Sequence, residues 1–112
     1  MKNYFKYEII LVKYPFTDLS DTKVRPAVII SEDNTLLDVF IVPLTSKTNK
    51  LLSDEFVLEY WKESGLNIPT AVKRGIYTIS KKIIIKSIGK LKKKDANNLL
   101  ISVKKWLGLV KK

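Results

Sequence analysis

The sequence predicts a mainly β protein of the α+β class, a small antiparallel barrel with one C-terminal amphipathic helix packed across it. Two observations predict this fold. Short apolar stretches rich in β-branched residues recur through residues 1–91, with turn-forming residues between them. Beyond residue 95 the apolar period changes to that of a helix. With 112 residues, 46% of them hydrophobic, the chain is expected to form a single domain over 1–112.

The first part of the chain predicts three strands, over residues 9–12, 27–30 and 37–44. Pro26 fits at the first position of the second strand, where a missing N–H does little harm. Residues 17–22 and 32–34 are polar and turn-forming. The short turn between the second and third strands predicts an antiparallel hairpin.

The second part predicts a loop over 45–54, a short strand at 56–58, one helical turn over 59–64 ended by Gly65, and strands at 69–73, 76–79 and 83–91. The last segment follows helical spacing, with one apolar face formed by Ala96, Leu99, Leu100, Val103, Leu107 and Val110. Asp95 in the first turn of this helix suits the helix dipole. Trp61 is expected in the core, whereas Trp106 lies off the helical stripe and is interpreted as a contact residue.

Charge is unevenly distributed along the chain, whose net charge is +10. Residues 1–70 contain 8 Lys or Arg and 10 Asp or Glu, whereas residues 71–112 contain 13 Lys or Arg and one acid, Asp95. In one small domain the second segment predicts a positive face that attracts phosphates or an acidic protein. The alternative is an ordinary solvated surface, because lysine is a common surface residue.

The sequence contains no cysteine and no histidine. Disulfides, thiolate metal sites and an imidazole acid/base pair are therefore excluded. The carboxylates are scattered and show no spacing typical of a metal site. Residues 1–6 lack the apolar core of a signal peptide, and no apolar run approaches the roughly 20 residues that span a bilayer. We expect a cytoplasmic protein without a metal, a cofactor or a membrane association.

Five stretches of the chain form an ordered set of motifs: Ile10–Asp18 (ILVKYPFTD), Val24–Ser31 (VRPAVIIS), Ile41–Ser46 (IVPLTS), a middle segment with Asp54–Leu58 (DEFVL), Gly65–Leu66 and Pro69–Thr70, and Ile88–Leu91 (IGKL). In this order and at this spacing they resemble the MazF/PemK-like toxin family of type II toxin–antitoxin systems. The resemblance covers nearly the whole chain.

The resemblance implies a CcdB/MazF-type barrel, close to an SH3-like fold, that works as a homodimer. It also implies an endoribonuclease, an mRNA interferase, that cleaves single-stranded RNA through the substrate's own 2′-hydroxyl and leaves a 2′,3′-cyclic phosphate. The implied partners are single-stranded RNA and an acidic antitoxin that neutralises the toxin.

Arg25 matches the catalytic arginine of this family. A guanidinium grips two phosphate oxygens and stabilises the charge that develops on them. Its high pKa makes arginine a poor general base, so electrostatic stabilisation is the role we expect. The structural alternative is an exposed arginine before a proline.

Thr45 matches the catalytic threonine of the family, and Ser46 lies beside it as a substrate-binding candidate. A hydroxyl here hydrogen-bonds a phosphate oxygen or helps to place the 2′-hydroxyl. The alternative is a hydroxyl that caps a turn after a strand.

The further candidates for substrate binding are Phe16, Thr17, Lys47, Lys73 and Arg74. Phe16 and Thr17 lie in the first loop, where the ring of Phe16 is expected to stack on an unpaired base. The alternative is that Phe16 is a core residue that holds the loop. Lys47, like Lys50 in the same loop, is placed to follow the RNA backbone, the alternative being an ordinary surface lysine.

Three features depart from the family pattern. Tyr7-Glu8 replaces the usual Gly-Asp or Gly-Glu at the start of the first strand, and the histidine that some relatives carry in the first loop is absent. Some relatives also carry Arg-x-Asp, with the Asp as base, where this chain has Lys73-Arg74-Gly75 and no acid. An Asp-based mechanism is therefore not carried over, and Arg25 and Thr45 either suffice or support weak activity.

Two other functions remain open. One is a protein of the same fold that binds RNA or a protein without cleaving it, which the missing acid favours. The other is a CcdB-like topoisomerase poison, for which the sequence offers no motif. Fold analogy alone does not separate these functions.

Overall fold

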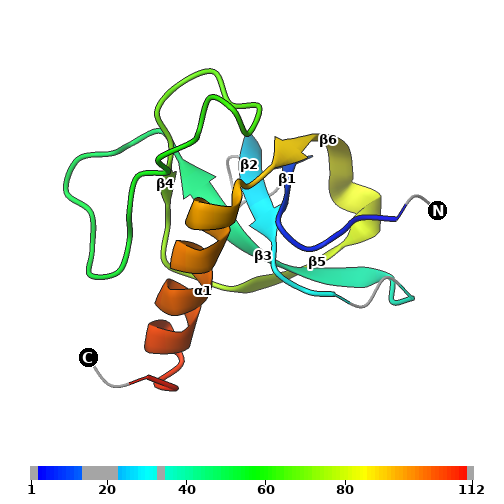
Figure 1. Cartoon of the computed structure of the whole chain (residues 1–112). Coiled ribbons are helices and arrows are strands. Elements are labelled where there is room, and N and C mark those ends of the chain that lie inside the picture. Colours follow the sequence, from blue (N-terminus) through cyan, green and yellow to red (C-terminus); the bar gives the residue numbers. More distant parts are fainter. Residues whose placement is uncertain (1–2, 14–22, 33–34, 111–112) are drawn as a thin grey trace.

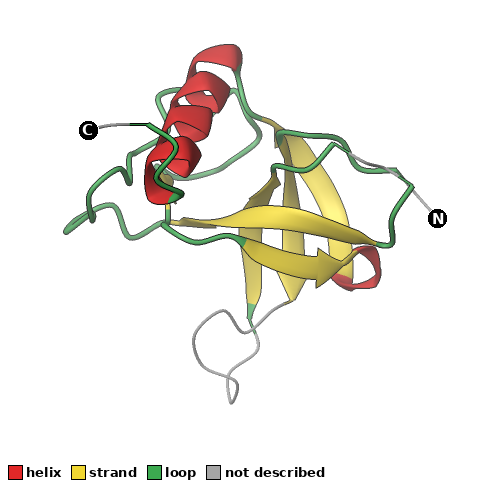
Figure 2. Ribbon diagram, turned by 90° about the horizontal axis from the view of Figure 1, so that it is seen from below, coloured by secondary structure: helices red, strands yellow, loops and turns green. Residues whose placement is uncertain are grey.

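The computed structural model describes residues 3–13, 23–32 and 35–110. The elements in chain order are β1 (Glu8–Lys13), β2 (Val24–Ile29), β3 (Asp38–Thr45), β4 (Ala71–Val72), β5 (Tyr77–Ser80), the 3-10 helix η1 (Lys81–Ile83), β6 (Ile84–Lys90) and α1 (Lys93–Trp106). Figure 1 shows α1 lying across one face of the sheet, and Figure 2 shows the strongly twisted sheet beside it. The predicted antiparallel sheet and C-terminal helix are confirmed.

The six strands pair in the order β4-β3-β2-β1-β6, with β5 also paired to β3. All these pairings are antiparallel, including the predicted hairpin of β2 and β3. Among the described strands the sheet is not closed, so the predicted small barrel takes the form of an open six-stranded antiparallel sheet. Its edges are covered instead, since Val57 forms a bridge to Ala71 of β4 and the turn at Ser64 lies against Gly89 of β6.

Two hydrophobic clusters lie on the two faces of the sheet because successive residues of a strand point to opposite faces. The first cluster lies between the sheet and α1 and contains Ile9, Val28, Val42, Leu44, Leu58, Leu66, Val72, Leu91, Ala96 and Leu99. The second lies on the other face and contains Tyr4, Ile10, Val12, Ala27, Ile29, Val39, Ile41, Ile79 and Ile84. The central strands are thus buried on both sides, which explains their continuous apolar runs.

The helix ends earlier than its apolar spacing predicts. Leu107 and Val110, which were assigned to the helical face, lie beyond the last helical residue, and their side chains are 56% and 42% exposed. Gly108 adopts a φ of 73°, and its N–H donates to the carbonyl of Lys105 while the N–H of Leu109 donates to that of Lys104. These two hydrogen bonds, together with a glycine in the left-handed conformation, form a Schellman motif, which ends the helix.

Segment 56–65 also differs from the prediction in detail. The expected strand at 56–58 is reduced to the bridge between Val57 and Ala71. Residues 59–65 form turns closed by a bond from Ser64 N–H to the carbonyl of Tyr60. Gly65 has the expected left-handed φ, 96°. A Cβ at Gly65 would lie 2.1 Å from the carbonyl oxygen of Ile88, so this turn packs backbone to backbone against β6.

Asp95 ties this turn to α1. The side chain is completely buried, and its two carboxylate oxygens accept from the backbone N–H groups of Glu59 and Tyr60, each at 2.9 Å. A buried carboxylate is tolerated only when its oxygens are hydrogen-bonded. Asp95 was interpreted from the sequence as a helix-dipole residue, whereas the structure uses it as a tertiary link over 36 residues of chain.

The half-buried Trp61 and Trp106 both pack against the first cluster. Within the described ranges, no helix has the length and apolar character needed to cross a bilayer.

We predict that Asp95→Ala lowers the free energy of unfolding by about 2–4 kcal/mol, because it leaves two backbone N–H groups without their acceptor. Urea denaturation followed by circular dichroism measures this change. Asp38→Asn, at an exposed position of β3, is the control and should change stability by less than about 0.5 kcal/mol. Equal stability of the two variants would show that water replaces the Asp95 bonds at no cost.

Candidate functional site

Arg25 and Thr45 lie on adjacent strands, β2 and β3. The two strands are paired antiparallel, with Ala27 opposite Pro43 as the last pair toward this end. Arg25 and Thr45 each lie two residues beyond that last pair, on the face of Ala27 and Pro43, because the side chains of a strand alternate between faces. The fold therefore brings two residues that lie 20 positions apart in the sequence to the same end of two neighbouring strands.

Arg25 lies at the border of the second cluster. It is the second residue of β2, it is half-buried, and it is paired on its other side with the buried Val12 of β1. Within the described part of the chain, no carboxylate forms an ion pair with Arg25. A half-buried stem next to apolar neighbours holds the guanidinium in place while leaving its charge available at the surface.

Thr45 is the last residue of β3 and is also half-buried. Its Oγ1 accepts a hydrogen bond from the N–H of Lys47 at 3.1 Å. The turn-capping use of this hydroxyl, the alternative raised by the sequence, is therefore present. Because a hydroxyl that accepts still has a proton to donate, the same bond orients Thr45 without consuming its donor. Ser46 and Lys47 follow on the exposed surface.

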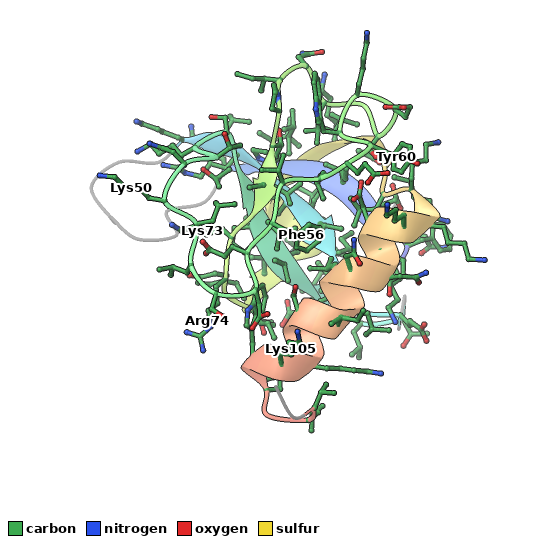
Figure 3. All side chains as sticks on the ribbon, turned by 60° about the vertical axis from the view of Figure 1, so that its left-hand side comes forward. Lys50, Phe56, Tyr60, Lys73, Arg74 and Lys105 are labelled. Atoms are coloured by element: carbon green, nitrogen blue, oxygen red, sulfur yellow. The ribbon has the colours of Figure 1, made fainter. Side chains whose placement is uncertain are left out.

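Lys73 and Arg74 follow β4, which is paired to the end of β3 through Ala71 and Thr45. Both side chains are exposed. The N–H of Lys73 donates to the carbonyl of Pro43 at 2.9 Å, so this segment stays attached to β3. Figure 3 shows Lys50, Lys73 and Arg74 succeeding one another along one margin of the molecule. The two first-loop candidates, Phe16 and Thr17, lie outside the described residues.

Glu55 is not among the residues that the sequence predicts for the site. It lies next to Arg74 of the segment Lys73-Arg74-Gly75, where this chain lacks the acid that some relatives carry. Its Oε1 accepts from the N–H of Leu52 and its Oε2 from the N–H of Arg74, each at 2.7 Å. The carboxylate thus joins the end of the 46–55 loop to the segment after β4. Glu55 stands 19 positions before Arg74, so only the tertiary fold brings them together.

A second polar cluster, formed by Glu59, Tyr60 and Lys94, lies at the start of α1, beside the turn held by Asp95. The Lys94 Nζ donates to Glu59 Oε1 at 2.8 Å, and this bond, together with one from the Tyr60 hydroxyl, lowers the pKa of the Glu59 carboxyl. The same contacts with Glu59 raise the pKa of Tyr60 and of Lys94. All three side chains are solvated, so this cluster resembles an ordinary surface network.

The described residues contain no group of three or more His, Cys, Asp or Glu side chains arranged to hold a metal ion. The polar groups gathered near Thr45 are instead hydroxyls and cations. Hydroxyls and cations are ligands for phosphate groups rather than for a metal.

The arrangement of strands and helix matches the fold of solved toxin structures. A mycobacterial endoribonuclease solved in complex with its cognate antitoxin is similar with a TM-score of 0.78 at 18% identity, over 97% of this chain and 99% of that one. The Mycobacterium tuberculosis toxin MazF-mt6 has a TM-score of 0.73 at 22% identity, over 93% and 99%. MazE–MazF from Deinococcus radiodurans has a TM-score of 0.68 at 9% identity, over 97% and 100%. At these identities the likeness establishes the fold.

The sequence itself establishes the family. Residues 6–107 match the model of the PemK-like, MazF-like toxins of type II toxin–antitoxin systems. Because the match covers almost the whole chain, this protein belongs to that family, as its motifs indicated. No curated protein matches the chain significantly.

We predict that Glu55→Gln weakens the attachment between the 46–55 loop and the segment after β4. Glutamine offers one acceptor oxygen for two N–H donors, so we expect a loss of about 1–2 kcal/mol in the free energy of unfolding. Amide hydrogen exchange should also accelerate at Leu52 and Arg74. Glu63→Gln, at an exposed position, is the matched control. Unchanged exchange at both amides would contradict the role given to Glu55.

Proposed function

We propose that this protein is a metal-independent endoribonuclease that cleaves single-stranded RNA, including mRNA, and leaves a 2′,3′-cyclic phosphate. The observation that supports this most directly is that Arg25 and Thr45 lie at the same end of the neighbouring strands β2 and β3. Membership of a toxin family and the fold shared with proteins described as endoribonucleases support the same conclusion.

RNA carries its own nucleophile, so the protein needs to orient the scissile phosphate and stabilise the charge on it. In the proposed reaction the 2′-hydroxyl loses its proton, its oxygen forms a bond to phosphorus, and the bond to the 5′-oxygen breaks as that oxygen takes up a proton. Arg25 stabilises the non-bridging oxygens as negative charge develops on them. Thr45, oriented by its bond with Lys47, donates to one of these oxygens. Ser46, Lys47, Lys73 and Arg74 are proposed to bind the flanking RNA, together with Phe16 and Thr17 of the first loop.

The choice of general base bears on a second function, because cleavage needs a group that takes the proton of the 2′-hydroxyl. Glu55 is the acid next to Arg74, but both of its oxygens already accept backbone N–H groups. A carboxylate used in this way holds structure and is a poor candidate to take the 2′-proton. The specific alternative is therefore a protein that binds RNA or another protein at the same surface without cleaving it.

The proposed partners follow from charge and from relatives. Residues 71–112 carry 13 basic residues against one acid, which attracts an acidic protein as well as RNA. Two relatives with the same fold were solved with an antitoxin. We propose that an acidic antitoxin neutralises this protein, that the active form is a homodimer, and that it acts in the cytoplasm.

We predict that Arg25→Ala lowers the rate of RNA cleavage by about 10²–10³-fold, the usual effect of removing one group that stabilises a developing oxyanion. The measurement uses a long unstructured RNA in excess EDTA, with the cyclic phosphate ends identified by mass spectrometry. Lys86→Ala, on the edge strand β6 and separated from β2 by β1, is the control for charge alone. RNA that stays intact with the folded wild type would favour the binding function.

Thr45 provides a second test in the same assay. Thr45→Val removes the hydroxyl and should lower the rate by about tenfold or more, whereas Thr45→Ser keeps the hydroxyl and should retain most activity. An equal loss in both variants would mean that the methyl packing of Thr45 matters and its hydroxyl does not.

We also predict that the purified protein has twice the chain mass of 12.9 kDa in light scattering. A homodimer buries apolar side chains that are exposed on this chain, among them Phe40 and Ile101. A monomer at all concentrations would remove the homodimer from the proposed function.

A further inference from the structure

A cavity of about 300 Å³ lies at the C-terminal end of α1, apart from Arg25 and Thr45. It is lined by Leu52, Ser53, Asp54, Arg74, Lys105 and Trp106. Figure 3 shows Arg74 and Lys105 on the same side of the molecule, beside the last turn of α1. We propose that this cavity is a subsite for one nucleotide of single-stranded RNA, outside the scissile position. This inference rests on the proposed function, since it assigns a second contact to the same substrate.

The charges of the cavity suit a phosphate. Arg74 is exposed, and within the described residues no carboxylate forms an ion pair with its side chain. Lys105 Nζ lies 3.6 Å from Asp54 Oδ1, a long ion pair between side chains that are 32% and 17% exposed. A phosphate oxygen at Lys105 gains an ionic hydrogen bond without removing this partner. The cavity therefore presents one fork-shaped cation and one point-charge cation.

Its walls suit a base. Leu52 is 63% exposed, and Trp106 is half-buried against the first cluster. Sites for single-stranded nucleic acids combine an aromatic side chain, on which a base stacks, with cations along the backbone. The volume also lies at the lower end of the range of small-ligand sites, about 300–1,000 Å³.

The indole Nε1 of Trp106 is buried and has no hydrogen-bond partner within the described part of the chain. Buried polar groups are nearly always paired, so this donor marks a place where an acceptor is missing. Acceptor atoms are present on every nucleobase. In the proposed complex the ring turns when a base enters the cavity, so that its N–H, which is buried in the structure, reaches such an acceptor.

The cavity is also held in shape before a ligand binds. Glu55 accepts from Leu52 N–H and from Arg74 N–H, so its carboxylate connects two walls that are far apart in the sequence. Because these walls are already ordered, less conformational entropy is lost when a ligand binds.

The position of the cavity is compatible with one RNA strand that contacts both sites. Thr45 is paired with Ala71 of β4, and Arg74 lies three residues further along the chain. At about 3.3 Å per extended residue, Arg74 lies at most about 10 Å from Ala71. Lys73 lies between them, so a strand that leaves Thr45 across the β4 edge meets a cation before it reaches the cavity.

Binding is tested with a 2′-O-methyl RNA oligonucleotide of about ten nucleotides, which spans a typical single-strand site and cannot be cleaved because its 2′-oxygens are blocked. In the Trp61→Phe variant, Trp106 is the remaining tryptophan, and its fluorescence reports directly on the cavity. We expect saturable quenching. Lys86→Ala in this background should keep the quenching, because β6 contributes no residue to the cavity.

The same oligonucleotide, labelled for polarisation, measures affinity in the wild-type background, where the Trp61 substitution is not needed. Arg74→Ala and Lys105→Ala should each weaken binding by about fivefold to tenfold, and Trp106→Phe, which keeps a stacking ring but loses the N–H, by about twofold to fivefold. Lys86→Ala on β6 removes the same charge at a remote place and should change affinity by less than about twofold.

Two results would overturn the subsite. One is oligonucleotide binding that neither quenches Trp106 nor depends on Arg74, which leaves the proposed cleavage at Arg25 intact. The other is quenching by a Glu-rich peptide at concentrations where the oligonucleotide has no effect, which assigns the cavity to an acidic protein instead. If the wild type does not cleave RNA in EDTA, that result contradicts the proposed cleavage and not the binding of RNA in the cavity.

Discussion

The buried carboxylate of Asp95 is the interaction on which the rest of the molecule depends most. It accepts the backbone N–H groups of Glu59 and Tyr60 and so fixes the start of α1 to the turn over 59–65. That turn in turn packs against β6, where Gly65 and Gly89 allow the two backbones to touch. Since Asp95 is fully buried, its charge is tolerated only in this hydrogen-bonded position, and this requirement excludes other placements of the helix.

The direction of α1 has consequences at its other end. Ala96 and Leu99 pack on the first cluster, and the helix then continues until the Schellman motif at Gly108 stops it. Its last turn, with Lys105 and Trp106, comes to lie beside Leu52 and Arg74. A cavity is thus formed by three segments that are distant in the sequence.

The sheet positions the candidate site by a different constraint. Its strands are buried on both faces, and a slip of one residue would exchange the residues of the two clusters. This selects the register in which Ala27 faces Pro43, and Arg25 and Thr45 each lie two residues beyond this pair. The two polar residues lie where the second cluster ends. The packing of the apolar core therefore positions them, and folding requires no contact between the two side chains.

Glu55 illustrates how charge is divided between structure and function in a strongly basic protein. The acid closest to the Lys73-Arg74-Gly75 segment binds two backbone N–H groups and holds a loop. The cations around it remain available to a ligand. The family pattern indicated that an acid was missing from this segment, and the fold supplies one from elsewhere in the chain, in a structural role.

The sequence by itself determined the antiparallel sheet, the C-terminal helix, the family and the choice of Arg25 and Thr45. These follow from local patterns: apolar period, turn residues and short motifs, all of which act over a few neighbouring residues. Only the tertiary structure decided the open sheet, the burial of Asp95, the role of Glu55 and the cavity at Trp106. Each of these depends on groups 19 or more positions apart or on the space left between packed elements, and a linear pattern carries no information about which distant backbone N–H a carboxylate will reach.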